Sequence, residues 1–215
     1  MKATKYVKID GKFQMHRGGY LESPSIAYET WGKKHTDCNA ILIFTGLSPS
    51  AHASSSTKDP KSGWWEDMIG SGLPLDTDKY FIICVNSLGS CFGSTGPASI
   101  DPISGKPYKL NFPVLSLEDV AKGGYEVIKS LGLKKVYTII GCSMGGMSAL
   151  SFCIQFPEIS ERLISISSSA RALPFSIAIR SLQREMIRKD SKWLEGNYDP
   201  SDPPIEGPRL ARKLG

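Results

Sequence analysis

The stretch from Val136 to Leu150 constrains the fold more than any other part of the chain. Its first five residues are uncharged and mostly β-branched, which predicts a strand buried on both faces. A Gly-x-Ser-x-Gly turn from Gly141 to Gly145 follows, and a helical stretch of small residues then runs to about Phe156. A strand, a tight glycine turn and a helix in this order indicate a nucleophile elbow, with the hydroxyl of Ser143 exposed at the carboxyl end of a sheet.

Ser143 also has a simpler interpretation, as a residue that caps a helix after a glycine turn. A bare Gly-x-Ser-x-Gly match would not separate the two interpretations. The buried strand before it and the helix after it favour the nucleophile. The N–H of Met144, at the start of that helix, would then face the oxyanion that develops during attack on a carbonyl.

Buried strands alternate with helices along the chain, which predicts an α/β domain with a largely parallel sheet. Short antiparallel strands are expected between residues 5 and 30, and buried strands at 39–44, 80–85 and 162–168. A helix should begin with a capping box at Ser116 and stop at Gly132. We therefore expect a core domain over residues 1–170 and the start of a helical lid over residues 171–215.

Composition and charge exclude several classes of protein. The formal net charge of +5 is modest and the basic residues are dispersed, so nucleic acid is not an expected partner. No apolar run reaches the length of a membrane span, and the N-terminus has no apolar core of a signal peptide. The five cysteines form no Cys-x-x-Cys pair and no His cluster accompanies them, which predicts reduced thiols in the cytoplasm and no metal site: Cys38, Cys84, Cys91, Cys142 and Cys153.

A serine nucleophile needs a base, usually a histidine that an acidic residue orients. In the α/β-hydrolase arrangement the chain order is nucleophile, acid, histidine. Here all three histidines, His16, His35 and His52, precede Ser143. His52 lies in the loop after the strand at 39–44 and could line the pocket, but its place in the chain order argues against its being the base.

Two further candidates rest on position alone. The second oxyanion donor should be a backbone N–H in the loop after Phe44, where we choose Leu47, although an ordinary loop fits the sequence as well. Arg180 and Arg184 share one face of a predicted helix. They form either a solvated basic face or a fork that binds carboxylates.

Several multi-residue motifs occur together and in order, and the chain from about residue 20 onward resembles the homoserine O-acetyltransferase family. The motifs are Tyr28–Gly32, Gly63–Trp65, Leu75–Phe81, Gly93–Pro97, Gly141–Met147 and Leu210–Gly215. Two stretches, 45–53 and 170–185, are most similar to the serine O-succinyltransferase branch. These enzymes have the α/β-hydrolase fold and transfer an acyl group from acyl-CoA to an amino-acid hydroxyl.

The resemblance implies a largely parallel sheet with helices on both faces. It also implies the nucleophile Ser143, the oxyanion donors Leu47 and Met144, and a ligand for the amino-acid carboxylate, Arg212. Arg180 would select a donor whose acyl group ends in a carboxylate, because an added guanidinium suits succinyl better than acetyl. The loop that would select the substrate is Ser48, Pro49, Ser50, Ala51 and His52.

The family's acid and base lie on strands after the lid, so the resemblance predicts that these residues and the last strands are absent here. A truncated chain or a separate segment would account for that, and the chain alone should turn over negligibly. The expected substrates are acyl-CoA, as a co-substrate rather than a bound cofactor, and L-serine or L-homoserine. The resemblance also implies a role in cysteine or methionine biosynthesis, with a homodimer when the chain is complete. An esterase or thioesterase and a non-catalytic fragment are the alternatives.

Overall fold

The computed structural model describes residues 3–35 and 39–215, and the chain divides into two compact units, Met1–Ser169 and Ala170–Gly215. The expected boundary between core and lid lies beside this division. That the second unit serves as a lid stays a prediction. Each unit is described by itself below.

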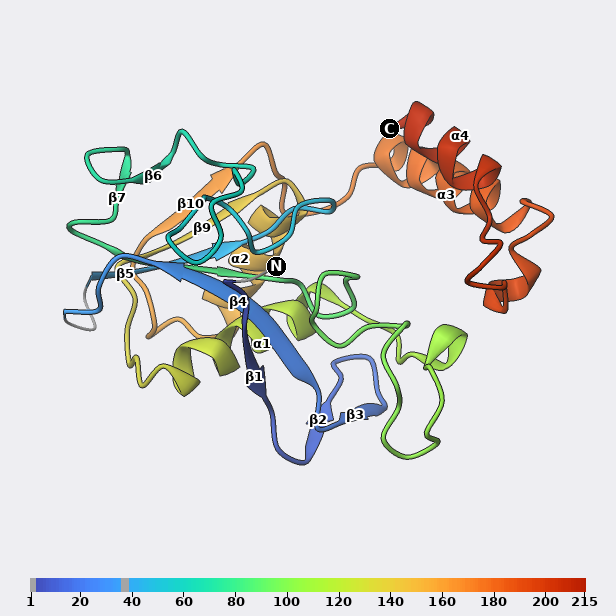
Figure 1. Ribbon diagram of the computed structural model, residues 1–215, viewed down its shortest axis with the longest axis horizontal. Coiled ribbons are helices and arrows are strands. Elements are labelled where there is room, and N and C mark those ends of the chain that lie inside the picture. The colour runs from blue at the N-terminus through green and yellow to red at the C-terminus, as the bar shows by residue number, and fades with distance from the viewer. Residues whose placement is uncertain (1–2, 36–38) are drawn as a thin grey trace. The chain divides into compact units, whose positions relative to one another are not determined.

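Unit 1 is built on a six-stranded sheet with the strand order β1-β4-β8-β5-β9-β10 (Figure 1). Neighbouring strands from β8 to β10 are parallel, whereas β1 and β4 pair antiparallel. The predicted α/β class with a largely parallel sheet is confirmed. The strands are β1 (Lys5–Lys8), β4 (Ser25–Trp31), β5 (Ala40–Phe44), β8 (Phe81–Val85), β9 (Thr138–Cys142) and β10 (Leu163–Ile166).

Two small two-stranded sheets and a short 3-10 helix, η2 (Lys109–Asn111), complete the minor elements of unit 1. One small sheet joins β2 (Lys12–Gln14) to β3 (Tyr20–Glu22), and the other joins β6 (Ile69–Gly70) to β7 (Leu75–Asp76). The antiparallel strands predicted in the first 30 residues are therefore found as β1 to β4.

The register of the parallel strands places the carboxyl ends of β5, β8 and β9 side by side at one edge of the sheet. Phe44, the last residue of β5, pairs with Val85 on one side and with Gly141 on the other. The loops that follow β5, β8 and β9 consequently leave the same edge of the sheet. In open parallel sheets this edge is where ligands bind.

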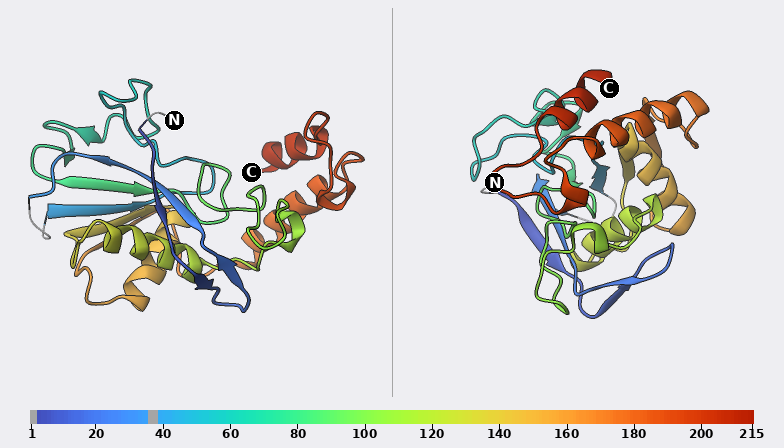
Figure 2. Two further views of the ribbon diagram at one scale, coloured as in Figure 1. Left: turned by 60° about the horizontal axis from the view of Figure 1, so that its bottom comes forward. Right: turned by 90° about the vertical axis from the view of Figure 1, so that its right-hand side faces the viewer.

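Helices α1 (Leu117–Ser130) and α2 (Met144–Gln155) pack against each other on one face of the sheet (Figure 2). The capping box predicted at Ser116 is present, with Asp119 as its acidic member. Inward-facing side chains of the strands join both helices in one buried core, which includes Phe44, Val127 and Phe152. This core fixes the helix that follows the glycine turn.

Among the described residues of unit 1, the segment from residue 51 to residue 80 covers the other face of the sheet (Figure 2). The expectation of helices on both faces stays a prediction. Ala51, Ala53 and Ile69 are buried there against Ile43 and Ile82, and the side chains of two neighbouring tryptophans, Trp64 and Trp65, pack beside them. The segment contains serines, Pro60 and Gly63 and no apolar period of a helix, so it forms a loop that carries apolar anchors.

Strand β10 is exposed, which corrects the expectation of a buried strand at 162–168. It lies at one edge of the described sheet, and its Leu163, Ile164 and Ile166 are 37%, 47% and 38% exposed. Its apolar residues resemble those of central strands, but within the described residues only β9 pairs with it.

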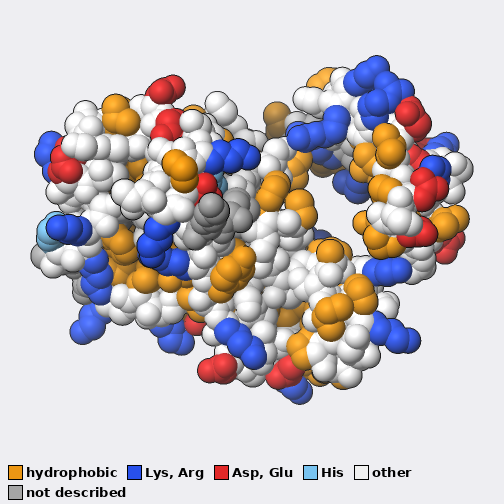
Figure 3. Space-filling model, in the orientation of Figure 1, with side chains coloured by type: hydrophobic (Ala, Val, Ile, Leu, Met, Phe, Trp, Pro, Cys, Tyr) orange, Lys and Arg blue, Asp and Glu red, His pale blue; other side chains and the backbone are white. Residues whose placement is uncertain are grey.

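Unit 2 is a helical hairpin of α3 (Pro174–Arg188) and α4 (Glu206–Leu214), with a 3-10 helix, η3 (Leu194–Gly196), between them. The helices approach closely at Gly207, where a Cβ would lie 2.5 Å from the carbonyl oxygen of Met186. Its surface mixes basic side chains with apolar ones such as Phe175 and Ile177 (Figure 3). None of the described helices in either unit is long and apolar enough to cross a membrane.

Candidate functional site

Ser143 sits in the sharp turn between β9 and α2, where it has φ 55° and ψ −122°. A positive φ is strained for a residue with a Cβ, and such strain persists only where the surroundings enforce it. The N–H of Ser143 donates to the carbonyl of Ile166 at 2.9 Å, which ties the turn to β10. The residue itself is exposed, as a nucleophile requires.

The two glycines of the motif allow the turn to be this tight. A Cβ at Gly141 would lie 2.1 Å from the carbonyl oxygen of Gly145. A Cβ at Gly145 would lie 2.2 Å from the carbonyl oxygen of Phe44, so the start of α2 rests directly on the end of β5. The close approach of strand and helix explains why the sequence has glycine at both positions.

A cavity of about 550 Å³ lies beside this turn, at the carboxyl edge of the sheet. The loops after β5 and β8, the start of α1 and the start of α2 all contribute to its wall. Leu47 and Met144, the two predicted oxyanion donors, both line it, so the fold brings together residues far apart in the sequence. The other lining residues are Arg17, Thr45, Gly46, Pro49, Ser87, Leu88, Gly89, Ser90, Leu115, Ser116, Leu117, Glu118 and Val120.

The backbone N–H groups of Leu47 and Met144 are the polar groups that matter most in this wall. Within residues 3–35 and 39–215, neither N–H donates a hydrogen bond to another part of the chain. Met144 is the first residue of α2, so its N–H is among those that a helix leaves without an internal partner, at the positive end of the helix dipole. Such donors can stabilise an oxyanion.

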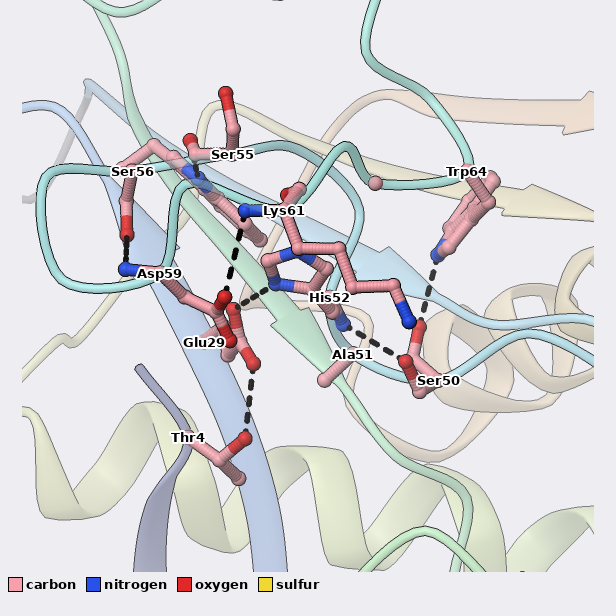
Figure 4. A network of polar contacts seen from close by, with 12 residues as sticks. Thr4, Glu29, Ser50, Ala51, His52, Ser55, Ser56, Asp59, Lys61 and Trp64 are labelled. Atoms are coloured by element: carbon pink, nitrogen blue, oxygen red, sulfur yellow. Dashed lines mark hydrogen bonds and ion pairs between the residues drawn. The ribbon is translucent and has the colours of Figure 1, made fainter. Parts of the chain in front are cut away.

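The predicted specificity loop divides into two halves. Pro49, in the first half, lines the cavity, and Leu47, the residue just before the loop, is 59% exposed. Ala51 and His52 are buried, and the Ala51 N–H donates to Asn86 Oδ1 at 2.6 Å. The carbonyl of Ser50 accepts from the indole of Trp64 at 2.8 Å (Figure 4). The second half therefore anchors the loop and does not line this cavity.

No histidine ring is hydrogen-bonded to Ser143 in the described part of the chain. The ring nitrogens of His52 contact a carboxylate oxygen of Glu29 at 2.9 Å and the carbonyl of Lys61 at 2.7 Å. His16 is exposed, and its Nε2 lies 3.8 Å from Oε1 of Glu118. Because both ring nitrogens of His52 have other partners, His52 does not act as the base for Ser143, in agreement with its place in the chain order.

Sequence reasoning missed several residues of the cavity wall. Arg17 comes from the β2–β3 turn, and Ser90 and Leu115 come from the two ends of the long loop between β8 and α1. The hydroxyl of Ser90 is buried and has no hydrogen-bond partner within the described residues, so it is available to a polar ligand. Only the tertiary fold brings these residues to the elbow, and no local pattern marks them.

Arg180 and Arg212, predicted to bind substrate, lie in α3 and α4 of unit 2. The guanidinium of Arg180 is exposed and donates to Gln183 Oε1 at 2.7 Å, and Gln183 in turn donates to the carbonyl of Ala211 at 2.8 Å. This chain of contacts joins the two helices near Arg212. Their roles toward a substrate stay predictions.

A larger cavity of about 840 Å³ lies beside Trp31, at the C-terminal end of β4. None of the predicted site residues lines this cavity. Within the described ranges, no group of three or more His, Cys, Asp or Glu side chains is arranged to hold a metal ion. The described cysteines are free thiols, and burial raises the pKa of Cys84, Cys142 and Cys153. Cys38 lies outside the described residues.

Residues 39–215 match the family model of the alpha/beta hydrolase fold, and the chain belongs to this family. The serine O-succinyltransferase of Litchfieldella anticariensis is 52% identical over 214 residues, which are 99% of this chain and 58% of that protein. This chain therefore spans little more than half the length of that curated relative.

Two solved structures extend the comparison. The homoserine O-acetyltransferase of Bacillus anthracis matches with a TM-score of 0.89 and 31% identity, over all of this chain and 60% of that one. Esterase E22 also matches with a TM-score of 0.89 and 30% identity, over 98% of this chain and 60% of that one. The resemblance to the homoserine O-acetyltransferase family, including its serine O-succinyltransferase branch, is confirmed.

Proposed function

We propose that this chain carries the nucleophile of an amino-acid O-acyltransferase, which moves a succinyl group from succinyl-CoA to the hydroxyl of L-serine. The observation that carries the proposal is the exposed Ser143 in a strained elbow, beside a cavity lined by Leu47 and Met144. The names of the relatives support the transfer of an acyl group to an amino acid. Acetyl-CoA and L-homoserine are the alternative substrates.

The reaction would proceed by double displacement. Ser143 Oγ loses its proton to a base and attacks the thioester carbonyl, and the N–H groups of Leu47 and Met144 stabilise the oxyanion. The carbon–sulfur bond then breaks, and CoA leaves as a thiol with a proton. The amino-acid hydroxyl attacks the acyl-enzyme, loses its proton, and releases Ser143 as the new ester forms.

The choice of donor rests on positive charge. Arg17 supplies a guanidinium to the cavity wall, but Glu118 in the same wall opposes its charge, so the proposed choice of an anionic donor depends on Arg180. Arg180 is proposed to select the succinyl carboxylate and Arg212 to bind the carboxylate of the amino acid. A cytoplasmic homodimer that acts in cysteine or methionine biosynthesis is part of the same proposal.

The test uses the purified chain with succinyl-CoA and L-serine, and chromatography to follow CoA and O-succinylserine. In the part of the chain that the structure describes, no histidine ring is hydrogen-bonded to Ser143, so we expect negligible turnover without an added base. Imidazole supplied in solution should restore slow product formation, with a succinyl group on the peptide that carries Ser143. Ser143→Ala should remove both signals.

Equal rates of product formation for the Ser143→Ala variant and the unsubstituted chain in the presence of imidazole would refute the acyl-enzyme. Steady turnover without imidazole would instead refute the expectation that the chain alone lacks a base. Both comparisons are made on the same preparation, with circular dichroism as the control for folding.

A hydrolase is the second candidate, because one structural neighbour at 30% identity is an esterase. The two functions differ in what receives the acyl group. If the succinyl group on Ser143 goes to water even at high L-serine, and free succinate is the only product, the chain belongs to a hydrolase. Exclusion of water from the intermediate is what a transferase needs.

A further inference from the structure

His52 and Glu29 form a buried pair at the end of the loop that carries Leu47 (Figure 4). The two side chains are 6% and 1% exposed, and Nδ1 of His52 lies 2.9 Å from Oε2 of Glu29. The other oxygen of Glu29 accepts from the hydroxyl of Thr4 at 2.8 Å. Nε2 of His52 lies 2.7 Å from the carbonyl oxygen of Lys61. Both ring nitrogens therefore have partners inside the protein.

These partners determine the protonation of the ring. A backbone carbonyl only accepts hydrogen bonds, so Nε2 of His52 must carry a proton. Nδ1 of His52 lies 2.9 Å from Oε2 of Glu29, and because a carboxylate only accepts hydrogen bonds, this contact requires a proton on Nδ1 as well. With protons on both nitrogens the ring is an imidazolium. The pair is then a buried cation and anion, each with its remaining hydrogen bonds satisfied.

The surrounding charges agree with this assignment. Burial by itself lowers the pKa of His52, but the hydrogen bonds to Glu29 and to the Lys61 carbonyl, with the charges of Glu29 and Asp59, raise it overall. Glu29 belongs to β4, and its negative charge helps to raise the pKa of the buried Cys84 thiol on the neighbouring strand β8, after the larger effect of burial. Lys5 of β1 interacts with the charge of Glu29, and Lys58, in the loop that follows His52, interacts in turn with Lys5. The side chain of Lys61 lies beside the pair (Figure 4).

The pair lies at the C-terminal end of the loop that runs from Leu47 to His52. Gly46 contacts the elbow, since a Cβ there would lie 3.3 Å from the Cys142 carbonyl, and Leu47 is exposed. The anchors come later, where the Ala51 N–H bonds to Asn86 and the His52 N–H bonds to Ser50 Oγ at 3.2 Å. Loss of one of these anchors should lower the local stability of the loop, which amide exchange can measure.

We propose that His52, held as an imidazolium by Glu29, is a positioning residue that fixes the loop from Leu47 to His52 beside the elbow. The loop loosens when His52 loses its proton. Its role in catalysis, which is to hold the Leu47 N–H toward the oxyanion, rests on the function proposed above. The charge of the ring and the hold on the loop do not depend on that function.

The charge is tested by nitrogen NMR of the histidine side chains in the full chain between pH 5 and pH 8. The expected spectrum of His52 has protons on both ring nitrogens at pH 6.5, with the loss of one only at higher pH. In Glu29→Gln, the neutral form with the proton on Nε2 should appear at lower pH than in the unsubstituted chain. A neutral His52 ring at pH 5.5 in the folded, unsubstituted chain would overturn the proposal.

The hold on the loop is tested by amide hydrogen exchange of residues 47–53. His52→Gln keeps a side chain that can hydrogen-bond but removes the charge, and it should speed exchange in these residues at pH 6 by about tenfold or more. In the unsubstituted chain the same amides should lose protection beyond the intrinsic pH effect as His52 deprotonates. His16→Gln, at an exposed histidine, is the matched control and should change neither result.

Exchange in residues 47–53 that is the same in His52→Gln and the unsubstituted chain would also overturn the proposal. If His52→Gln does not fold, the pH series on the unsubstituted chain decides the question by itself. Loss of Ser143-dependent acyl transfer with the expected NMR and exchange results would refute the proposed function and leave the role of His52 standing.

Discussion

Ser143 has a backbone conformation, φ 55° and ψ −122°, that glycine adopts more readily than serine. Strain of this kind costs about 1–3 kcal/mol and is offset by the surrounding packing. We therefore predict that Ser143→Gly is more stable than Ser143→Ala by about 1 kcal/mol, although both lack the nucleophile. Urea unfolding of the two variants, followed by fluorescence, measures the difference. A Ser143→Ala variant as stable as Ser143→Gly would show that the turn is not strained.

Gly145 gives a second prediction at the level of single residues. A Cβ there would lie 2.2 Å from the Phe44 carbonyl oxygen, which belongs to a buried strand and cannot yield easily. Gly145→Ala should destabilise unit 1 by about 1–3 kcal/mol. Gly123→Ala in α1 is the matched control, because its Cβ would meet only the side chain of Ile26, with Cδ1 at 3.1 Å, and no backbone atom. It should be neutral or stabilising by up to about 1 kcal/mol. Equal effects in urea unfolding would contradict the prediction.

The sequence predicts Ser143 and Met144 as site residues because strand, turn and helix are contiguous there. Leu47 follows only from its position after a buried strand, and the structure brings it to the same cavity as Met144. Arg17 and Ser90 have no such local signal. They reach the cavity through the β2–β3 turn and the long loop before α1, and the paths of those segments depend on tertiary packing.

Strands β9 and β10 show how position in the sheet changes the contribution of the same residue type. Ile140 and Ile164 are direct partners in the register, but Ile140 is 2% exposed and Ile164 is 47% exposed. Ile140→Ala should therefore cost about 2–5 kcal/mol, and Ile164→Ala less than about 1 kcal/mol. Urea unfolding of both variants checks the difference. If Ile164→Ala proved as costly as Ile140→Ala, β10 would be buried in solution, by contacts that the described residues do not make.

Individual elements differ in how far the sequence specifies them. Helix α1 is predictable because its capping box at Ser116 and its stop at Gly132 are local signals. The segment that covers the second face of the sheet, residues 51–80, cannot be predicted in this way, because its apolar residues have no regular spacing. Side-chain contacts hold it, such as the hydrogen bond from the Trp64 indole to the Ser50 carbonyl. The exposure of β10 cannot be predicted from the sequence either, because apolar runs have the same pattern in central and edge strands.

At the scale of the whole molecule, the pair of His52 and Glu29 links stability to pH. The folded-state pKa of His52 is raised, so its contribution is complete below its unfolded value of about 6.5 and is lost as pH rises through the folded value. Hydrogen bonds from the Ser55 hydroxyl and the Gly63 N–H lower the pKa of Glu66. The contribution of Glu66 to the free energy of unfolding is complete above about pH 4.3, the pKa of an unfolded glutamate, and is lost as pH falls through its folded-state pKa.

We therefore predict that the free energy of unfolding of unit 1 is highest between about pH 4.3 and pH 6.5 and falls from pH 6.5 to pH 8. His52→Gln should flatten the fall on the alkaline side, whereas His16→Gln should leave that fall unchanged. Trp193→Phe as the common background removes the one tryptophan of unit 2, so that fluorescence during urea unfolding reports unit 1 alone. The range ends at pH 8 because unfolded thiols ionise near pH 8.5 and burial raises the pKa of Cys84, which adds a separate loss of stability above that pH. A fall between pH 6.5 and pH 8 that survives His52→Gln would mean that another group carries the dependence.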